Sequence, residues 1–155
     1  MPPSRRRTAR LAHLALLPAA SAVGIWSGGP CLSACQLCLS LVNFGDKPLD
    51  APFLEKQCEG GLRAESLYLC SEVHCPGEDT VAGLRPLNES CRGINSTLPP
   101  LDIVAGLTGE ERDRVRRVDA VSEDGSDVYD EAIIPSKDLL GLSVETLVGF
   151  HLSCA

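Results

Sequence analysis

The sequence predicts a mainly α-helical fold, a small disulfide-rich domain followed by a largely disordered acidic C-terminal tail. Seven of the eight cysteines lie between Cys31 and Cys91, and aromatic residues make up only 4% of the 155-residue chain. Few large side chains are therefore available for a core, and in an oxidising compartment such dense cysteines form disulfides that replace it. Apolar residues recur at helical spacing through this part, which indicates helices.

Residues 1–22 are typical of a signal peptide. Four arginines precede an apolar block at Leu11–Leu17, and Ala20-Ser21-Ala22 supplies the small-x-small pattern that signal peptidase accepts. We expect cleavage after Ala22, entry into the secretory pathway, and a final location outside the cell or at the outer face of the plasma membrane. A mitochondrial presequence is the alternative, but it would spread its arginines along an amphipathic helix.

Charge and hydropathy narrow the function classes. Removal of residues 1–22 takes four of the 14 basic residues and none of the 21 acidic ones, so the net charge changes from −7 to −11. Such an acidic chain lacks the basic surface that binds nucleic acid, so no nucleic-acid partner is expected. No apolar run of transmembrane length follows the signal peptide, and no membrane span is expected there.

We divide the remainder into a cysteine-rich helical domain, residues 23–105, and a tail, residues 106–155. Within the domain, Cys31 to about Val42 is predicted to be helical, since Cys31, Cys35 and Cys38 then share one face. A loop is expected over 43–52, where glycine and proline interrupt the pattern. A second helix is predicted from about Ala64 to His74.

A third helix is predicted to begin at Glu78 and Asp79, because acidic residues favour a helix N-terminus. Pro86 should kink this helix or end its first half. The side chains expected to face inward are Val81, Leu84, Leu87 and Cys91.

The tail is predicted to contain a short charged helix, an acidic linker and an amphipathic end. Thr108 and Glu111 have the spacing of a capping box. Glu110–Arg114 and Asp113–Arg117 are four residues apart, so on a helix they would pair. Arg116-Arg117 also has the form of a dibasic processing site, but we favour a solvated charged helix.

The sequence indicates few stabilising contacts for the tail after the charged helix. Ser122 to Asp130 is acidic and contains glycine and serine, and we expect it to be disordered. Leu139 to Leu152 has helical periodicity without an evident partner surface.

Six cysteines are the disulfide candidates. They are Cys31, Cys35, Cys58, Cys70, Cys75 and Cys91. Cysteines one turn apart on two antiparallel helices can bridge like rungs, which suggests Cys31–Cys75 and Cys35–Cys70, with Cys58–Cys91 as a third bridge. Eight cysteines allow roughly 100 full connectivities, so the sequence leaves the pairing open.

Other chemistry is weakly supported. Cys70, His74 and Cys75 are close in sequence, but they lack the paired spacing of structural zinc sites, so no metal site is predicted. No dinucleotide, phosphate-loop or nucleophile-elbow motif is present, and we predict no catalytic or cofactor-binding residue. Asn88-Glu-Ser90 and Asn95-Ser-Thr97 are N-glycosylation sequons, which predict a glycan-bearing surface at Asn88 and Asn95.

Taken in order, several short motifs resemble the extracellular N-terminal region of fungal ferric/cupric reductase transmembrane components. The similarity covers most of residues 31–150, and its specificity lies in the order and spacing of the motifs. They are Cys31-Leu-Ser-Ala-Cys35-Gln36, Cys58, Ser66-Leu-Tyr-Leu-Cys70, Cys75, Leu87-Asn-x-x-Cys91, Leu98-Pro99 and Ile134-Pro135-Ser136.

The resemblance implies a plasma-membrane metalloreductase in which NADPH, FAD and two haems pass electrons to extracellular ferric or cupric chelates before metal uptake. The haem-ligating histidines and the flavin and nicotinamide sites of that family have no counterpart in this sequence. The chain alone is therefore not expected to be an enzyme or to bind a cofactor. Its expected partners are ferric or cupric chelates, or the membrane portion of a reductase.

Two departures from the family accompany the resemblance. Cys38 is additional to its six-cysteine pattern, and it either remains a thiol or pairs with Cys154. The ending at Ala155 falls where the family approaches its first membrane helix, which suggests a truncated product or a mispredicted gene end. The alternative function is a free-standing secreted cysteine-rich binding module, either a haem or metal scavenger or an effector.

Overall fold

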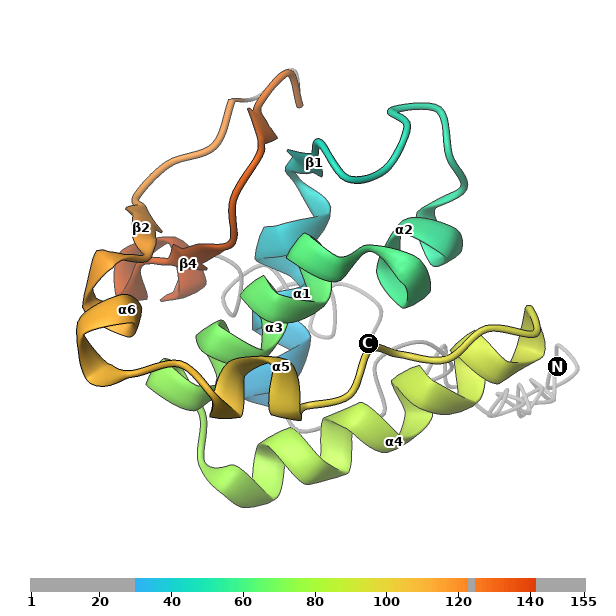
Figure 1. Ribbon diagram of the computed structural model, residues 1–155, viewed down its shortest axis with the longest axis horizontal. Coiled ribbons are helices and arrows are strands. Elements are labelled where there is room, and N and C mark those ends of the chain that lie inside the picture. Colours follow the sequence, from blue (N-terminus) through green and yellow to red (C-terminus); the bar gives the residue numbers. More distant parts are fainter. Residues whose placement is uncertain (1–29, 123–124, 142–155) are drawn as a thin grey trace, which may run out of the picture.

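A computed structural model describes residues 30–122 and 125–141 of the chain (Figure 1). Its elements follow one another as α1 (Pro30–Ser40), β1 (Asn43–Phe44), α2 (Phe53–Glu59), α3 (Gly61–His74), α4 (Gly77–Gly93), α5 (Asp102–Ala105), α6 (Gly109–Arg114), β2 (Arg116–Val118), β3 (Val128–Tyr129) and β4 (Ile133–Pro135). The predicted mainly helical, disulfide-rich fold is confirmed. Residues 1–29, which include the expected signal peptide, and residues 142–155, which include most of the expected amphipathic end, lie outside the described residues.

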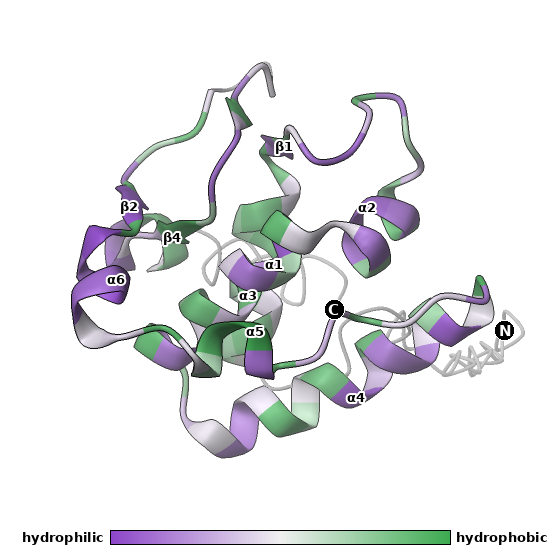
Figure 2. Cartoon of the chain, in the orientation of Figure 1, coloured by the Kyte–Doolittle hydropathy of each residue, from purple (hydrophilic) through white to green (hydrophobic). Residues whose placement is uncertain are grey.

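The core lies where α1 and α3 pack together. Leu32 and Leu39 from α1 meet Leu67 from α3, and all three are at most 1% exposed. Figure 2 shows apolar colouring along these two helices at the centre, whereas α6 at the rim is hydrophilic. Apolar residues and cysteines recur at helical spacing in both segments, and this local pattern made the two helices predictable from the sequence.

Two short parallel strand pairs tie the tail to the helices. Strand β1 pairs with β3, with Phe44 opposite Tyr129, and β2 pairs with β4. The prediction that Ser122 to Asp130 is disordered is therefore wrong for its second half, because β3 lies within it. The buried side chain of Tyr129 contacts Phe44, and this apolar contact holds the acidic segment.

Helix α4 differs from its prediction in two ways. It does not end at Pro86 but continues to Gly93, because Ala82 four residues earlier is exposed and its carbonyl can bond to water instead. The alternative that Pro86 kinks the helix stays a prediction. Val81 is 66% exposed rather than inward. The buried stripe of α4 contains Gly83, Leu87 and Cys91, and Val81 lies about 200° around the helix from Gly83.

Helix α6 has the predicted capping box at Thr108 and Glu111, and Arg114 pairs with Glu110. The expected Asp113–Arg117 helical pair is wrong, because the helix ends at Arg114 and Arg117 lies on β2. Helix α2 was not predicted at all.

The boundary placed at residue 105 does not separate two packing units among the described residues. Leu139 and Leu140 belong to the same core cluster as Cys35 and Cys38 of α1. The backbone N–H of Ile133 donates to Ser66 Oγ on α3 at 3.0 Å. The start of the amphipathic end therefore does have a partner surface, the one formed by α1 and α3.

We predict that Gly83→Ala destabilises the domain. A Cβ at Gly83 would lie 2.9 Å from Leu32 Cβ on α1, so the two helices would have to separate. We expect a loss of about 1–3 kcal/mol in the free energy of unfolding, measured by urea denaturation of the oxidised protein. Gly93→Ala in the same helix is the control, because nothing lies within 4 Å of its added Cβ. Equal effects of the two substitutions would contradict the close approach.

Candidate functional site

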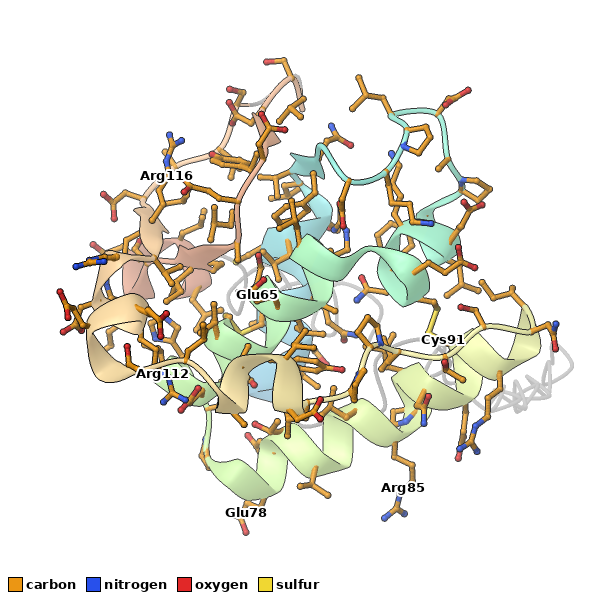
Figure 3. The ribbon with its side chains drawn as sticks, viewed as in Figure 1. Glu65, Glu78, Arg85, Cys91, Arg112 and Arg116 are labelled. Atoms are coloured by element: carbon orange, nitrogen blue, oxygen red, sulfur yellow. A yellow bond between two sulfur atoms is a disulfide. The ribbon has the colours of Figure 1, made fainter. Side chains whose placement is uncertain are left out.

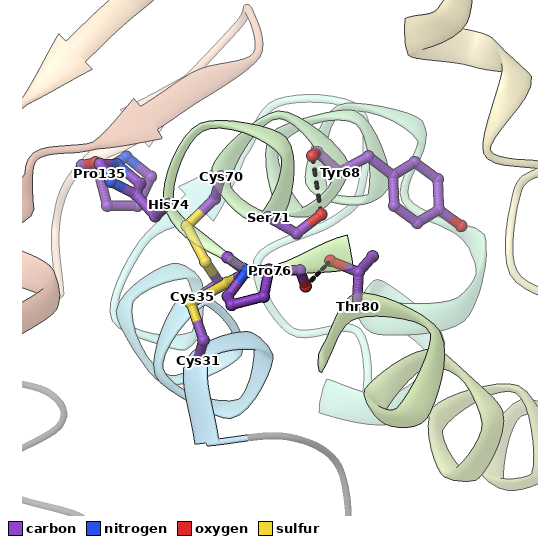
Figure 4. Close-up of a disulfide and its surroundings, with 10 residues drawn as sticks. Cys31, Cys35, Tyr68, Cys70, Ser71, His74, Pro76, Thr80 and Pro135 are labelled. Carbon is purple, nitrogen blue, oxygen red and sulfur yellow. Dashed lines mark hydrogen bonds between the residues drawn. A yellow bond between two sulfur atoms is a disulfide. The ribbon is translucent and has the colours of Figure 1, made fainter. Parts of the chain in front are cut away.

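Two disulfides join α1 to α3 like rungs. Cys31 and Cys35 lie one turn apart on α1, so their side chains project from one face. Cys31 bonds to Cys75 and Cys35 to Cys70, with Cα–Cα distances of 5.6 and 6.1 Å (Figure 4). Both distances are ordinary for disulfides. These are the pairs that the rung pattern suggested.

A third disulfide, Cys58–Cys91, joins α2 to α4 with a Cα–Cα distance of 5.4 Å. Both cysteines are fully buried. The bridge fixes the position of the unpredicted helix α2, because it attaches this short helix covalently to α4, the longest helix described. The three bridges use all six cysteines named as candidates.

Cys38 occupies the same face of α1 as the bridged cysteines and is buried. Its Sγ lies 3.7 Å from the backbone carbonyl oxygen of Leu139, to which it donates a weak hydrogen bond. The suggested partner Cys154 lies outside the described residues. Cys38 therefore contributes to the contact between α1 and the end of the described chain.

Arg63 of α3 holds the C-terminal end of α1. Its side chain is buried, and its guanidinium donates to the carbonyls of Leu39 and Val42, the second at 2.8 Å. Leu39 lies at the end of α1 and Val42 two residues beyond it, where no further helical turn supplies donors. The guanidinium also lies 5.2 Å from the ring centroid of Phe44, a cation–π distance.

Burial lowers the pKa of Arg63 to about 10, and the nearby carboxylate of Asp46 opposes that shift. The side chain therefore remains a cation at neutral pH. Sequence reasoning missed this residue because a lone arginine on a helix is normally exposed. The periodicity of α3 places position 63 next to Leu67 on one face, which is the signal that was available.

His74 serves a structural contact rather than a metal site. Its Nε2 lies 2.9 Å from the carbonyl oxygen of Pro135, so it ties the end of α3 to β4 (Figure 4). Its neighbours Cys70 and Cys75 are both in disulfides and do not act as thiolate ligands. Across residues 30–122 and 125–141, no three potential ligands gather at one place.

A shallow surface hollow beside α3 contains charged side chains. Its lining residues are Phe44, Asp46, Lys47, Lys56 and Arg63. Lys56 Nζ donates to Asn43 Oδ1 at 3.3 Å, and Lys47 pairs with Glu59 at 2.9 Å. The cations here are thus already bonded within the chain.

The two sequons differ in conformation. Asn88 is partly exposed on α4, and the hydroxyl of Ser90 donates to the Pro86 carbonyl at 3.0 Å. Asn95 is exposed in the turn after α4 with a φ of 60°, a left-handed conformation that asparagine tolerates better than most residues. Because Asn95 is exposed and Asn88 partly exposed, glycosylation remains a prediction that is compatible with the fold.

Comparisons of the chain with protein-family models, with curated proteins and with solved structures find no match. None of the helices described has the length and apolar character required to cross a membrane. The site is therefore defined by its own geometry, which is that of a small disulfide-rich domain of the kind found in secreted and extracellular proteins.

We predict that Arg63→Met lowers the free energy of unfolding by roughly 2–5 kcal/mol, because it leaves two buried carbonyls without a donor. Arg85→Met removes an exposed arginine and should change stability by less than about 0.5 kcal/mol. Urea denaturation of both variants tests this. If Arg63→Met does not fold, Arg63→Lys, which keeps one donor group, should give an intermediate loss. A result for Arg63→Met equal to Arg85→Met would show that the cap is unimportant.

We predict separate pH effects for two carboxyl groups. Hydrogen bonds from the Thr108 backbone and hydroxyl lower the pKa of Glu111, and the hydrogen bond from Lys47 lowers that of Glu59. Thr108→Ala should raise the pKa of Glu111 partway, since the backbone bond remains. Lys47→Gln should raise the pKa of Glu59.

Carbon-detected NMR titration of each variant provides the measurement, and each variant serves as the control for the other. Because a lowered folded-state pKa stabilises the fold above the unfolded-state pKa, this stability is lost as the pH falls through the folded-state value. A Thr108→Ala variant with an unchanged Glu111 pKa would contradict the capping assignment.

Proposed function

We propose that the chain is the outer, disulfide-braced domain of a plasma-membrane metalloreductase that reduces ferric or cupric chelates before metal uptake. One observation carries the proposal. The six cysteines that match the motif order of that family are the same six that form Cys31–Cys75, Cys35–Cys70 and Cys58–Cys91. A bridged domain of this size suits the oxidising outer face of a cell.

In such an enzyme, haem, FAD and NADPH carry the electrons, and this domain supplies no redox group for the transfer. Its role is that of a rigid, glycosylated cap beside the place where the chelate is reduced. The net charge of −11 that remains after removal of residues 1–22 favours an approach by cationic rather than anionic species.

The competing function is a free-standing secreted module that binds haem or a metal. Haem-binding surfaces need an apolar slot and an axial ligand. His74 is the one histidine among the described residues, and its Nε2 is bonded to the Pro135 carbonyl. The hollow beside α3 is lined mostly by charged rather than apolar side chains. These contacts favour the cap over the scavenger.

We predict that titration of the purified, oxidised chain with haemin gives the absorbance of free haemin, with no new Soret band. A haem-free globin titrated in parallel is the positive control.

Sequencing of the transcript beyond codon 150 is expected to reveal in-frame spanning helices with paired histidines. A saturable Soret band, or a transcript that stops at Ala155, would reject the reductase proposal in favour of the secreted module.

A further inference from the structure

The dibasic pair Arg116-Arg117 does not belong to the charged helix. Helix α6 ends at Arg114, and Val115 has a φ of −59° and a ψ of 131°, an extended conformation. Arg116 to Val118 then form strand β2. The reading of this pair as part of a solvated helix is therefore wrong, and the segment from Val115 onward has the extended shape in which endoproteases bind their substrates.

The basic side chains of this segment are accessible. The Arg114 side chain is 73% exposed, and Arg116 and Arg117 are both exposed. Figure 3 shows Arg116 at the rim of the molecule, beside β2 and away from the helical core. Its guanidinium lies 5.0 Å from the ring centroid of Tyr129, and within the described chain neither Arg116 nor Arg117 has an acidic partner.

Strand β2 also has one unpaired edge among the described residues. It belongs to a two-stranded sheet whose other member is β4, so one of its edges has no strand partner in the described chain. An unpaired edge is a template for pairing with a strand of another protein, and a protease cleft pairs with its substrate in this way.

We propose that the peptide bond between Arg117 and Val118 is a processing site for an endoprotease of the secretory pathway that is specific for paired basic residues. Arg117 would fill the pocket before the cut, with Arg116 and Arg114 as further basic contacts. Water is the co-substrate: the C–N bond breaks, hydroxide adds to the Arg117 carbonyl carbon to give a carboxylate, and the Val118 nitrogen becomes an amine. The proposal rests on secretion, not on the reductase assignment.

The fold controls how quickly this bond can be cut. Val118 is only 5% exposed, and the N–H of Ser136 donates to its carbonyl at 2.8 Å. Cleavage therefore requires β2 to separate from β4 locally, and its rate follows the population of this open form. Val118→Ala should weaken the contact and speed cleavage, although it leaves every arginine in place.

The test uses the full chain from residue 23 onward, oxidised and folded, with a purified calcium-dependent subtilisin-type protease specific for paired basic residues. Mass spectrometry should find a new N-terminus at Val118. Arg117→Gln should slow cleavage by roughly 100-fold or more, because the acidic protease pocket loses its cation. Arg116→Lys keeps a basic pair and should still be cut.

Arg85→Gln is the matched control, since it removes a single exposed arginine from the outer face of α4 (Figure 3) and should leave the rate unchanged. Circular dichroism of each variant checks that it folds. Two results would overturn the proposal: cleavage of Arg117→Gln at the wild-type rate, or cleavage after Arg117 only in the reduced and unfolded chain. Neither result bears on the haemin titration, so the two proposals fail separately.

Discussion

The covalent joining of α1 to α3 is the constraint on which the rest of the domain depends. The bridges Cys31–Cys75 and Cys35–Cys70 close loops with sequence separations of 44 and 35 residues. Each is expected to contribute about 2–4 kcal/mol, mainly by limiting the unfolded chain. Because only 4% of the residues are aromatic, buried sulfur also fills space that large rings occupy in other small domains. The bridges thus stabilise the fold and form part of its core.

The hydrogen bonds of Arg63, the contact with Phe44 and the pairing of β1 with β3 each depend on the joining of α1 to α3. With α1 fixed against α3, Arg63 donates to the carbonyl of Leu39 near the end of α1 and to that of Val42 just beyond it. The ring of Phe44, the last residue of β1, lies beside the same guanidinium. Strand β1 pairs in parallel with β3, which lies much later in the described chain. A buried cation is tolerated here because it bonds to the buried carbonyls of Leu39 and Val42.

The features predictable from sequence are the local ones. Helices α1 and α3 and the Thr108–Glu111 capping box depend on residues within a few positions of one another, and so does the rung spacing of the cysteines. The strand pairs were missed because they join segments such as 43–44 and 128–129, whose two residues show no alternation of their own. Helix α2 was missed because it is short and is held by its bridge to Cys91. Val81 was wrongly expected to face inward, because apolar residues lie on two faces of α4.

The disulfides cross-link only the first part of the described chain. All three bridges fall between residues 31 and 91, so α5, α6 and β2 to β4 are held to them by packing and hydrogen bonds. These contacts include the bond between Ser66 and Ile133 and the pairing of Arg112 with Glu72. A part held without cross-links can open at a lower free energy than the bridged part. If the segment that follows the bridges opens or is cut, the bridged helices stay cross-linked, but their core loses the buried side chains of Val118, Tyr129 and Ile133.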